Sequence, residues 1–199
     1  MSKNWFGWVR RLARRPGSSR AHDTALVSAA CMIECRDRLT LGRDVAIGPF
    51  SYIDASGGVV LGEGVHVASH VAIVTHSPHR ARRLLGPGYA GWPVASQGAR
   101  PGWIQGAVEI GAFTFVGPHS LIEAGTRIGR GSLVCAGSFV RGLYPEFVIL
   151  EGRPARVVGD SRTADAKALR RYPELQVLYD AWAATPGGTE GDPELRADA

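Results

Sequence analysis

A repeat of six residues runs through the second half of the chain and constrains its fold more than any other feature. Aliphatic side chains recur at every sixth position, at Ile110, Val116, Ile122, Ile128, Val134 and Val140. The same spacing occurs earlier, at Leu41, Ile47, Ile53, Leu61, Val67 and Ile73. A period of six fits neither a 3.6-residue helix nor the two-residue alternation of hairpin strands. It fits a chain that turns a corner after each short strand, so we predict an all-β fold, a parallel β-helix.

Glycine follows three of the aliphatic residues, and a short irregularity separates two of the runs. The three glycines are Gly111, Gly117 and Gly129. We predict that they lie at corners of the coil where the backbone adopts positive φ angles, which glycine tolerates. The run Ser56-Gly57-Gly58 adds two residues to the spacing and shifts the register. The Gly-Gly-x-Gly-x-Asp repeat of calcium-binding β-helices does not occur, so no calcium site is predicted.

Length and composition are those of one soluble globular domain with short appendages. The chain has 199 residues, of which 45% are hydrophobic and 21% charged. It contains neither the roughly 18 consecutive apolar residues of a membrane span nor the features of a signal peptide, so we expect a cytoplasmic protein. The three cysteines lack paired zinc spacing and are expected to be reduced. Among them, Cys135 is interpreted as a small corner residue rather than a nucleophile.

Charge is distributed unevenly along the chain. Residues 1–20 carry six basic side chains and no acid, whereas residues 160–199 carry eight acids and five bases. Residues 4–15 have the pattern of a short amphipathic helix, with one face formed by Trp5, Trp8, Val9 and Leu12. We expect this helix to dock on its own oligomer. The alternative is weak contact with an anionic membrane surface, which would place the protein at the inner face of the membrane.

The predicted domain organisation has three parts. Residues 1–24 form the basic arm and a linker, and residues 25–160 form the β-helix, which an inserted loop interrupts at 76–107. Residues 161–199 contain a C-terminal helix and an acidic tail. Helical spacing in this last part is carried by Leu175, Leu178, Tyr179 and Trp182.

The inserted loop is the predicted place of the chemistry, because long loops in compact domains are usually functional. It contains four arginines and no acid, a composition that suits an anionic ligand such as a phosphate, although a solvated loop is the alternative. We predict that the loop binds the substrate through Arg80, Arg83, Tyr89, Trp92 and Trp103.

Two histidines lie where a coil face gives way to this loop. They are His76 and His79, in the run Thr75-His76-Ser77-Pro78-His79. An imidazole accepts a proton near neutral pH and can return it to a leaving group, so both are candidate general bases. The alternative is that they are ordinary surface residues.

The repeats, the loop histidines and two later runs together resemble the hexapeptide-repeat O-acetyltransferases. The first run is Ala136-Gly137-Ser138-Phe139-Val140, and the second is Gly152-Arg153-Pro154-Ala155-Arg156. The similarity is to the sugar acetyltransferases of the maltose, galactoside and polysaccharide-modifying kind, and it covers residues 38–160. Phe115 departs from the tryptophan that many relatives have at this position.

This resemblance implies a left-handed β-helix, against the usual right-handed crossover rule, that assembles as a homotrimer. It also implies acetyl-CoA as a co-substrate, with no permanently bound cofactor, and a sugar-like acceptor deprotonated by a loop histidine. We favour His79 as this base, with His76 orienting it or substituting for it. The matching positions place the coenzyme near Gly117, Ala136, Gly137, Ser138, Arg153 and Pro154. No metal is required by this mechanism.

Two other functions remain open at this point. Trimeric β-helices also include zinc carbonic anhydrases, for which His66, His70 and His119 would be the candidate zinc ligands. A non-catalytic scaffold on the same solenoid is the second alternative. Nucleic-acid binding is not predicted, because the basic residues lack a recognised reading motif.

Overall fold

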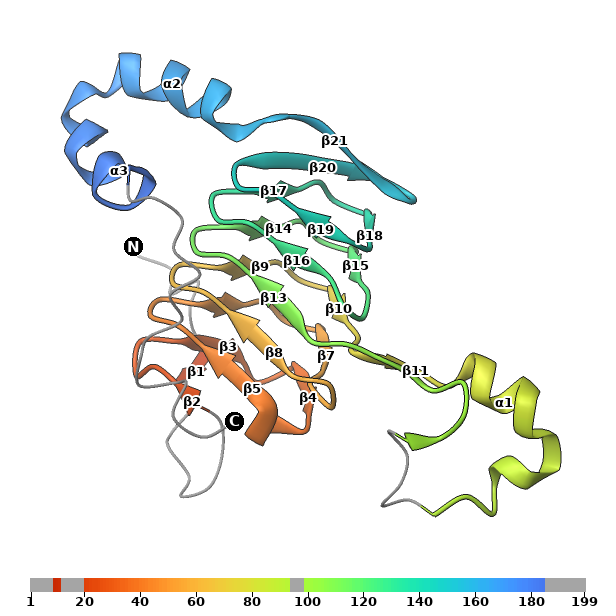
Figure 1. The fold of residues 1–199 in the computed structure, drawn as a ribbon. Helices are drawn as coiled ribbons and strands as arrows, with labels where there is room; N and C mark the ends of the chain where they lie inside the picture. The colour runs from red at the N-terminus through yellow and green to blue at the C-terminus, as the bar shows by residue number, and fades with distance from the viewer. Residues whose placement is uncertain (1–8, 12–19, 94–98, 185–199) are drawn as a thin grey trace.

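The predicted solenoid is confirmed, because the chain coils as a left-handed parallel β-helix in which three sheets form the faces (Figure 1). The computed structural model describes residues 9–11, 20–93 and 99–184. From β3 to β20, apart from β11 and β12, successive strands go to face A, face C and face B in turn, and each pairs in parallel with the strand one coil away. We name the three edges of the prism corner AC, corner CB and corner BA after the faces that meet there.

Each face is built from strands of two to six residues. Face A contains β1 (Val9–Arg11), β3 (Leu26–Ser28), β6 (Ala46–Ile47), β9 (His66–Val67), β14 (Phe115–Val116), β17 (Leu133–Val134), β20 (Val148–Gly152) and β21 (Ala155–Asp160). Face C contains β4 (Met32–Glu34), β7 (Tyr52–Asp54), β10 (Ala72–Ile73), β15 (Leu121–Ile122) and β18 (Phe139–Val140). Face B contains β2 (Arg20–Ala21), β5 (Leu39–Leu41), β8 (Val59–Leu61), β13 (Val108–Ile110), β16 (Arg127–Ile128) and β19 (Leu143–Tyr144).

The aliphatic side chains of the sixfold repeat fill the interior of the prism. All twelve predicted positions are buried, with exposed fractions of 3% or less. The strand register stacks them in columns, so that Ile73 lies between Ile53 and Ile122. Each buried side chain is worth about 1.5–3 kcal/mol relative to exposure, which explains why the period of six persists over so many coils.

The predicted reason for the repeat glycines is wrong. Gly111, Gly117 and Gly129 are not among the residues with positive φ. A side chain at these positions would instead collide with the next coil, and a Cβ added to Gly117 would lie 2.6 Å from the Ala136 nitrogen. The left-handed corner positions include other glycines and also larger residues, namely Cys35, Asp44, Phe50, His70, Phe113, His119 and Phe147.

The start of the chain differs from the predicted amphipathic helix. Within residues 4–15, the described segment Val9–Arg11 is the strand β1, which pairs antiparallel with β3. The edge of a sheet presents unpaired N–H and C=O groups, and a strand satisfies them where a helix would not. The rest of the predicted helix and the linker at 16–19 lie outside the described residues.

The predicted C-terminal helix is confirmed and is preceded by a second one. The elements are α2 (Ser161–Arg171), η4 (Pro173–Leu175) and α3 (Gln176–Ala183), and Asp160 caps α2 by accepting a hydrogen bond from the Arg162 N–H. Trp182 packs back on corner BA, with ring centroids 4.6 Å from Phe113 and 5.8 Å from Phe147. Within the described segments, no helix has the length and hydropathy needed to cross a bilayer. The acidic tail beyond residue 184 lies outside them.

The insertion is a structured arm rather than a plain loop. Its neck is the antiparallel pair β11 (His76–Ser77) and β12 (Ile104–Gln105), and the arm also contains α1 (His79–Leu85) and η2 (Gly86–Tyr89). The arm leaves the prism at corner CB and projects away from it (Figure 1). We call this segment, residues 76–107, the arm.

Candidate active site at the neck of the arm

The site begins where the Ser56-Gly57-Gly58 irregularity passes beside Thr75. The Gly57 N–H donates to Thr75 Oγ1 over 2.7 Å, and a Cβ on Gly57 would lie 2.9 Å from Thr75 Cβ. Thr75 is fully buried, and its own N–H donates to Asp54 Oδ2 over 3.0 Å. The two extra residues therefore place the Asp54 carboxylate and the Ser56 hydroxyl, both of one coil, beside His76, the first residue of the arm.

His76 is held by the carboxylate of Asp54. The Asp54 side chain is 1% exposed, and its Oδ2 lies 2.7 Å from His76 Nδ1. The Ser56 hydroxyl lies 3.0 Å from the same nitrogen. Because the carboxylate accepts, we assign the ring proton to Nδ1, which leaves Nε2 with a free lone pair. This is the tautomer that a general base needs.

Asp54 stays ionised in spite of its burial. Burial alone would raise the pKa of this carboxyl group, but hydrogen bonds from Ser56 and from the Thr75 backbone, together with the charge of His76, outweigh it and lower the pKa to about 2. The carboxylate is therefore charged at neutral pH and able to stabilise an imidazolium at His76.

Trp103 covers one face of the His76 ring. The two ring centroids are 4.9 Å apart and the planes are inclined by 6°. Gln105, two residues further along, donates from Nε2 to the Ser56 carbonyl over 3.0 Å. The returning strand of the arm thus contacts the His76 ring face through Trp103 and the coil that carries Asp54 through Gln105.

His79 lies in a different setting from His76. It is the exposed first residue of α1, and its Nδ1 lies 2.7 Å from the Ser77 hydroxyl. The sequence pattern favours His79 as the base, but the buried carboxylate partner belongs to His76.

The predicted substrate-binding residues are spread over the arm. Arg80 and Arg83 are exposed on α1, whereas Tyr89 is enclosed by two guanidinium groups, with Arg82 4.3 Å and Arg100 4.0 Å from its ring centroid. The backbone carbonyl of Trp92 accepts a hydrogen bond from Arg100. Trp103, as described above, stacks on His76. The contacts of Tyr89 and Trp103 are therefore made within the arm.

The six predicted coenzyme-binding residues gather at the other end of face C, on corner AC. The Gly137 N–H donates to the Pro118 carbonyl over 2.8 Å, and the Arg153 Nε–H donates to the Gly137 carbonyl. Arg153, Pro154 and Ala136 are exposed, whereas Ser138 is 1% exposed and its hydroxyl donates inward to the Cys135 carbonyl. The structure brings the six residues together but separates them from His76 by the width of face C.

The remaining candidate metal ligands do not converge on one point. His70 and His119 stack on each other at corner AC, with centroids 4.8 Å apart and planes inclined by 11°, and Phe50 stacks on His70. His66 lies on face A against the edge of Phe115. Across residues 9–11, 20–93 and 99–184, no group of three or more potential ligands could hold a metal ion.

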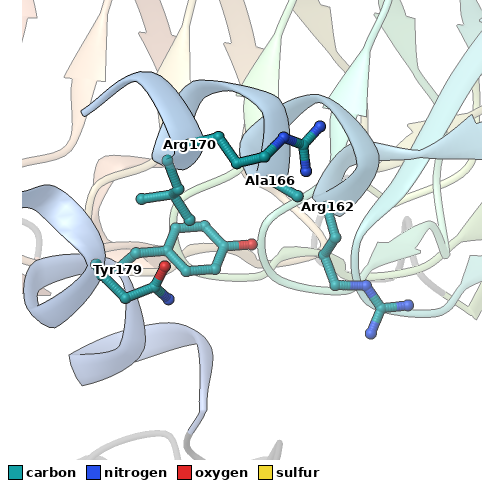
Figure 2. A pocket seen from close by; sticks show the side chains of 6 residues that line it. Arg162, Ala166, Arg170 and Tyr179 are labelled. Atoms are coloured by element: carbon teal, nitrogen blue, oxygen red, sulfur yellow. The ribbon is translucent and has the colours of Figure 1, made fainter. Parts of the chain in front are cut away.

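A separate shallow hollow of about 330 Å³ lies between α2 and α3 (Figure 2). Tyr179 lies at its centre, and its hydroxyl donates to Asp165 over 3.1 Å. Burial and the Asp165 carboxylate raise the pKa of Tyr179 to about 12, so this hydroxyl keeps its proton at neutral pH. The hollow is far along the chain from His76 and supplies neither an imidazole nor a thiol.

Three residues of the site escaped prediction from the sequence. They are Asp54, Ser56 and Thr75, which all lie within hydrogen-bonding distance of one another or of His76. The signal that could have found them is the two-residue slip at 56–58. In a coil of fixed period, residues about twenty positions apart are stacked, so the slip must lie directly beside the start of the arm.

The fold is similar to that of hexapeptide-repeat acetyltransferases, as the resemblance in sequence predicts. No family model matches the sequence. Two curated relatives match the sequence. "Probable acetyltransferase Rv3034c" of Mycobacterium tuberculosis is 28% identical over 72% of this chain and 43% of its own length. WbbJ of Escherichia coli K12, which carries the name of a lipopolysaccharide biosynthesis O-acetyl transferase, is 29% identical over 58% of this chain and 57% of its own length. The chain thus spans about half the length of the curated relatives it matches.

Solved structures agree on the fold. A galactoside acetyltransferase in complex with coenzyme A superposes with a TM-score of 0.56, at 21% identity, over 75% of this chain and 66% of that one. AntD, an N-acyltransferase from Bacillus cereus in complex with dTDP and 3-hydroxybutyryl-CoA, gives a TM-score of 0.57 at 17% identity, over 78% and 89% of the two chains.

Proposed function

We propose that this chain is an acyl-CoA-dependent O-acyltransferase that moves an acetyl group from acetyl-CoA to a hydroxyl of a sugar or polysaccharide precursor. The observation that carries the proposal is the partly buried imidazole of His76, held by the ionised Asp54 at the neck of the arm. The names of the relatives support the same reaction, since they describe acetyl transfer and, for WbbJ, an acceptor in lipopolysaccharide synthesis.

In the proposed reaction, His76 acts as the general base. Its Nε2 takes the proton of the acceptor hydroxyl while the oxygen attacks the thioester carbonyl carbon. The carbon–sulfur bond then breaks, the acetyl group stays on the acceptor oxygen, and the thiolate of coenzyme A recovers the proton from the imidazolium. Asp54 stabilises the imidazolium while it exists and keeps the ring in the productive tautomer. Binding donor and acceptor together removes much of the entropic barrier.

We propose that the protein works as a homotrimer, because in one chain the predicted coenzyme-binding residues and His76 lie at different corners. Three-fold contacts are heterologous, so a surface of one copy meets a different surface of the next. Such contacts can bring corner AC of one copy, with Gly137 and Arg153, beside corner CB of its neighbour, with His76. The cleft between copies would then hold acetyl-CoA and the acceptor.

The outward residues of the faces support this assembly. Face A presents an apolar row at Ala46, Phe115, Leu133 and Ile149, with His66 among them. Face C presents Met32, Tyr52, Ala72, Leu121 and Phe139. Face B instead carries the ion pair between Arg127 and Glu109. Apolar rows of this length suit contact with another copy.

We propose that the arm binds the acceptor. Arg80 and Arg83 are exposed on α1 a few residues after His76, and guanidinium groups bind phosphate in bidentate fashion. A nucleotide-linked or lipid-linked sugar phosphate fits this surface, and AntD, which has the same fold, is a complex with dTDP. The membrane contact of the N-terminal arm remains a second proposal, which binding to anionic vesicles would test.

Single substitutions at the two histidines test the proposal. Acetyl transfer is followed by release of the coenzyme A thiol over a panel of acceptor sugars and sugar phosphates. His76→Ala should lower kcat by about two to four orders of magnitude, whereas His79→Ala should stay within a few-fold of the parent. Full activity in His76→Ala would overturn the assignment of the base, and full activity in both variants would overturn histidine catalysis.

The remaining functions are separated by binding measurements on the same protein. Specific binding of acetyl-CoA to the native state must raise its melting temperature. No shift at millimolar acetyl-CoA would favour a scaffold, and one zinc ion per subunit with carbon dioxide hydration would favour a carbonic anhydrase.

A further inference from the structure

Trp103 stacks on His76 but has no role in the reaction proposed above. It lies near the end of the arm, one residue before β12, and its backbone N–H donates to the Arg100 carbonyl over 2.9 Å. Its indole is parallel to the His76 ring within 6°, at a centroid distance of 4.9 Å. Stacking is one of the favoured arrangements of aromatic rings, and an indole flat against the imidazole opposes rotation of the imidazole out of this plane.

We propose that Trp103 is a positioning residue for His76, which sets the plane of the imidazole and so the direction of Nε2. The proposal rests on the proposed function, in which Nε2 is the base. The hydrogen bond from Nδ1 to Asp54 fixes one point of the ring but permits the ring to swing about that point. The indole removes this freedom. A base held in one direction toward its proton reacts faster than one that samples several.

The indole also acts on the charge that the reaction creates. When Nε2 takes a proton, the ring becomes an imidazolium whose face lies on the indole, and a cation is attracted to an aromatic face at such distances. Trp103 and Asp54 therefore contact the developing charge from two directions, one across the ring face and one in the ring plane.

Trp103 is itself held by a stack of alternating cations and rings in the arm. Arg100 is 5% exposed, and its guanidinium carbon is 5.7 Å from the Trp103 ring centroid and 4.0 Å from that of Tyr89. Arg82 lies on the Tyr89 ring at 4.3 Å. The arm thus connects the surface of α1 to the catalytic imidazole through contacting side chains, and Trp103 is the last of them.

This role differs from the one predicted from sequence, in which Trp103 stacks on the acceptor. An acceptor-binding tryptophan contributes to ground-state binding, so its loss raises KM for the acceptor. A positioning residue contributes in the transition state, so its loss lowers kcat. The two roles therefore separate in the kinetic constants.

The test compares Trp103→Phe with Trp103→Leu. Both retain an apolar side chain, but only phenylalanine offers a flat face. We expect Trp103→Leu to lower kcat by about 10- to 100-fold, with KM for acetyl-CoA and acceptor within about two-fold of the parent, and Trp103→Phe to recover most of the loss. The readout independent of activity is the NMR signal of the His76 ring protons in histidine-labelled protein. These protons should lie upfield because of the stacked indole and move downfield in Trp103→Leu.

Failure of the Trp103 inference and failure of the His76 mechanism give different experimental results. A raised acceptor KM at unchanged kcat in Trp103→Leu would show that Trp103 binds the acceptor. This result would overturn the inference but leave the His76 mechanism unaffected. Equal kcat in the leucine and phenylalanine variants, with unshifted His76 protons, would overturn it as well. An active His76→Ala variant would instead refute the proposed base. Trp182→Ala, which alters a tryptophan at corner BA, is the control for nonspecific loss of an indole, and its His76 signals should not move.

Discussion

Asp54 and His76 are 22 positions apart in the chain, and 2.7 Å separate the carboxylate oxygen from the imidazole nitrogen. One turn of the coil accounts for this proximity, because residues one coil apart lie on top of each other. Asp54 ends a strand of face C, and His76 follows the strand stacked on it. The solenoid thus juxtaposes the two groups without any long-range loop.

Replacement of Asp54 by asparagine should damage catalysis more than folding. The amide carries no charge to stabilise the imidazolium and can hold the ring in the wrong tautomer. We expect kcat to fall by at least about two orders of magnitude with the circular dichroism spectrum unchanged. A variant within three-fold of the parent would show that the carboxylate has no part in the reaction. Glu63→Gln is the matched control, since Glu63 forms an exposed ion pair with Arg43 on a different corner.

The same carboxylate makes stability depend on pH in the acid range. Its pKa in the folded protein, about 2, is lower than the ordinary 3.8, so folding favours the ionised form. The resulting contribution, roughly 2 kcal/mol, is complete above about pH 5 and is lost as the pH falls from 4 toward 2. Urea unfolding of the parent and Asp54→Asn between pH 7 and pH 2.5 measures it. The stability difference between the two proteins should shrink on acidification, and a constant difference would contradict the assignment.

Gly117→Ala should destabilise the coil through a collision with the backbone. The new Cβ would lie 2.6 Å from the nitrogen of Ala136, and a coil of fixed rise cannot move away locally. We expect a loss of about 1–3 kcal/mol in urea unfolding. Gly88→Ala is the control, because no atom lies within 4 Å of the corresponding Cβ, and it should stay within about 0.5 kcal/mol of the parent. Equal stability of the two variants would argue against close approach as the role of the repeat glycines.

Phe115→Arg should disrupt the proposed trimer. Phe115 is 37% exposed on the apolar row of face A, and Val60 is similarly exposed, at 42%, on face B. We expect sedimentation to show smaller species for Phe115→Arg, whereas Val60→Arg keeps the parent's state. A charge buried in an interface without a partner costs several kcal/mol, enough to shift the assembly at micromolar concentration. Unchanged sedimentation of both variants would exclude face A from the interface.

Trp182→Ala should release the C-terminal helices and leave the prism intact. Trp182 contacts Phe113, Phe147 and Tyr179, and its carbonyl accepts from Arg130 over 2.9 Å. Loss of about 1.4 kcal/mol of docking energy would raise the rate of proteolysis within α2 and α3 about tenfold. Val177→Ala, at a side chain that is 78% exposed, should cleave at the parent's rate. Equal cleavage of all three proteins would mean that the aromatic contacts do not hold the helices.

The core was predictable because its physics is periodic. Ile53, Ile73 and Ile122 had to face inward once the six-residue period was recognised, and all three are fully buried. The role of the glycines was not predictable in the same way. Gly117 must lack a side chain because the backbone of the next coil lies too close. The sequence pattern alone cannot distinguish this requirement from a requirement for positive φ.

The sequence predicts where the candidate site lies but not which contacts its side chains make. The end of the repeat at residue 75 identifies the arm and its histidines. Which imidazole has a carboxylate partner depends on where Asp54 lies after the slip at residues 56–58, and the sequence spacing does not show this. Trp103 is 27 residues from His76 along the arm, and only the antiparallel pairing of Gln105 with His76 brings its ring into contact.

The narrow neck of the arm has an evolutionary consequence. The two short strands β11 and β12 form the neck that joins the arm to the prism, and the coils on either side continue in register beyond it, with Val108 paired to Val59. Segments beyond such a junction can lengthen, shorten or be replaced without disturbing the stack of coils. The proposed acceptor-binding surface could therefore change by exchange of this appendage alone, while Asp54 and the coils that carry it stay the same.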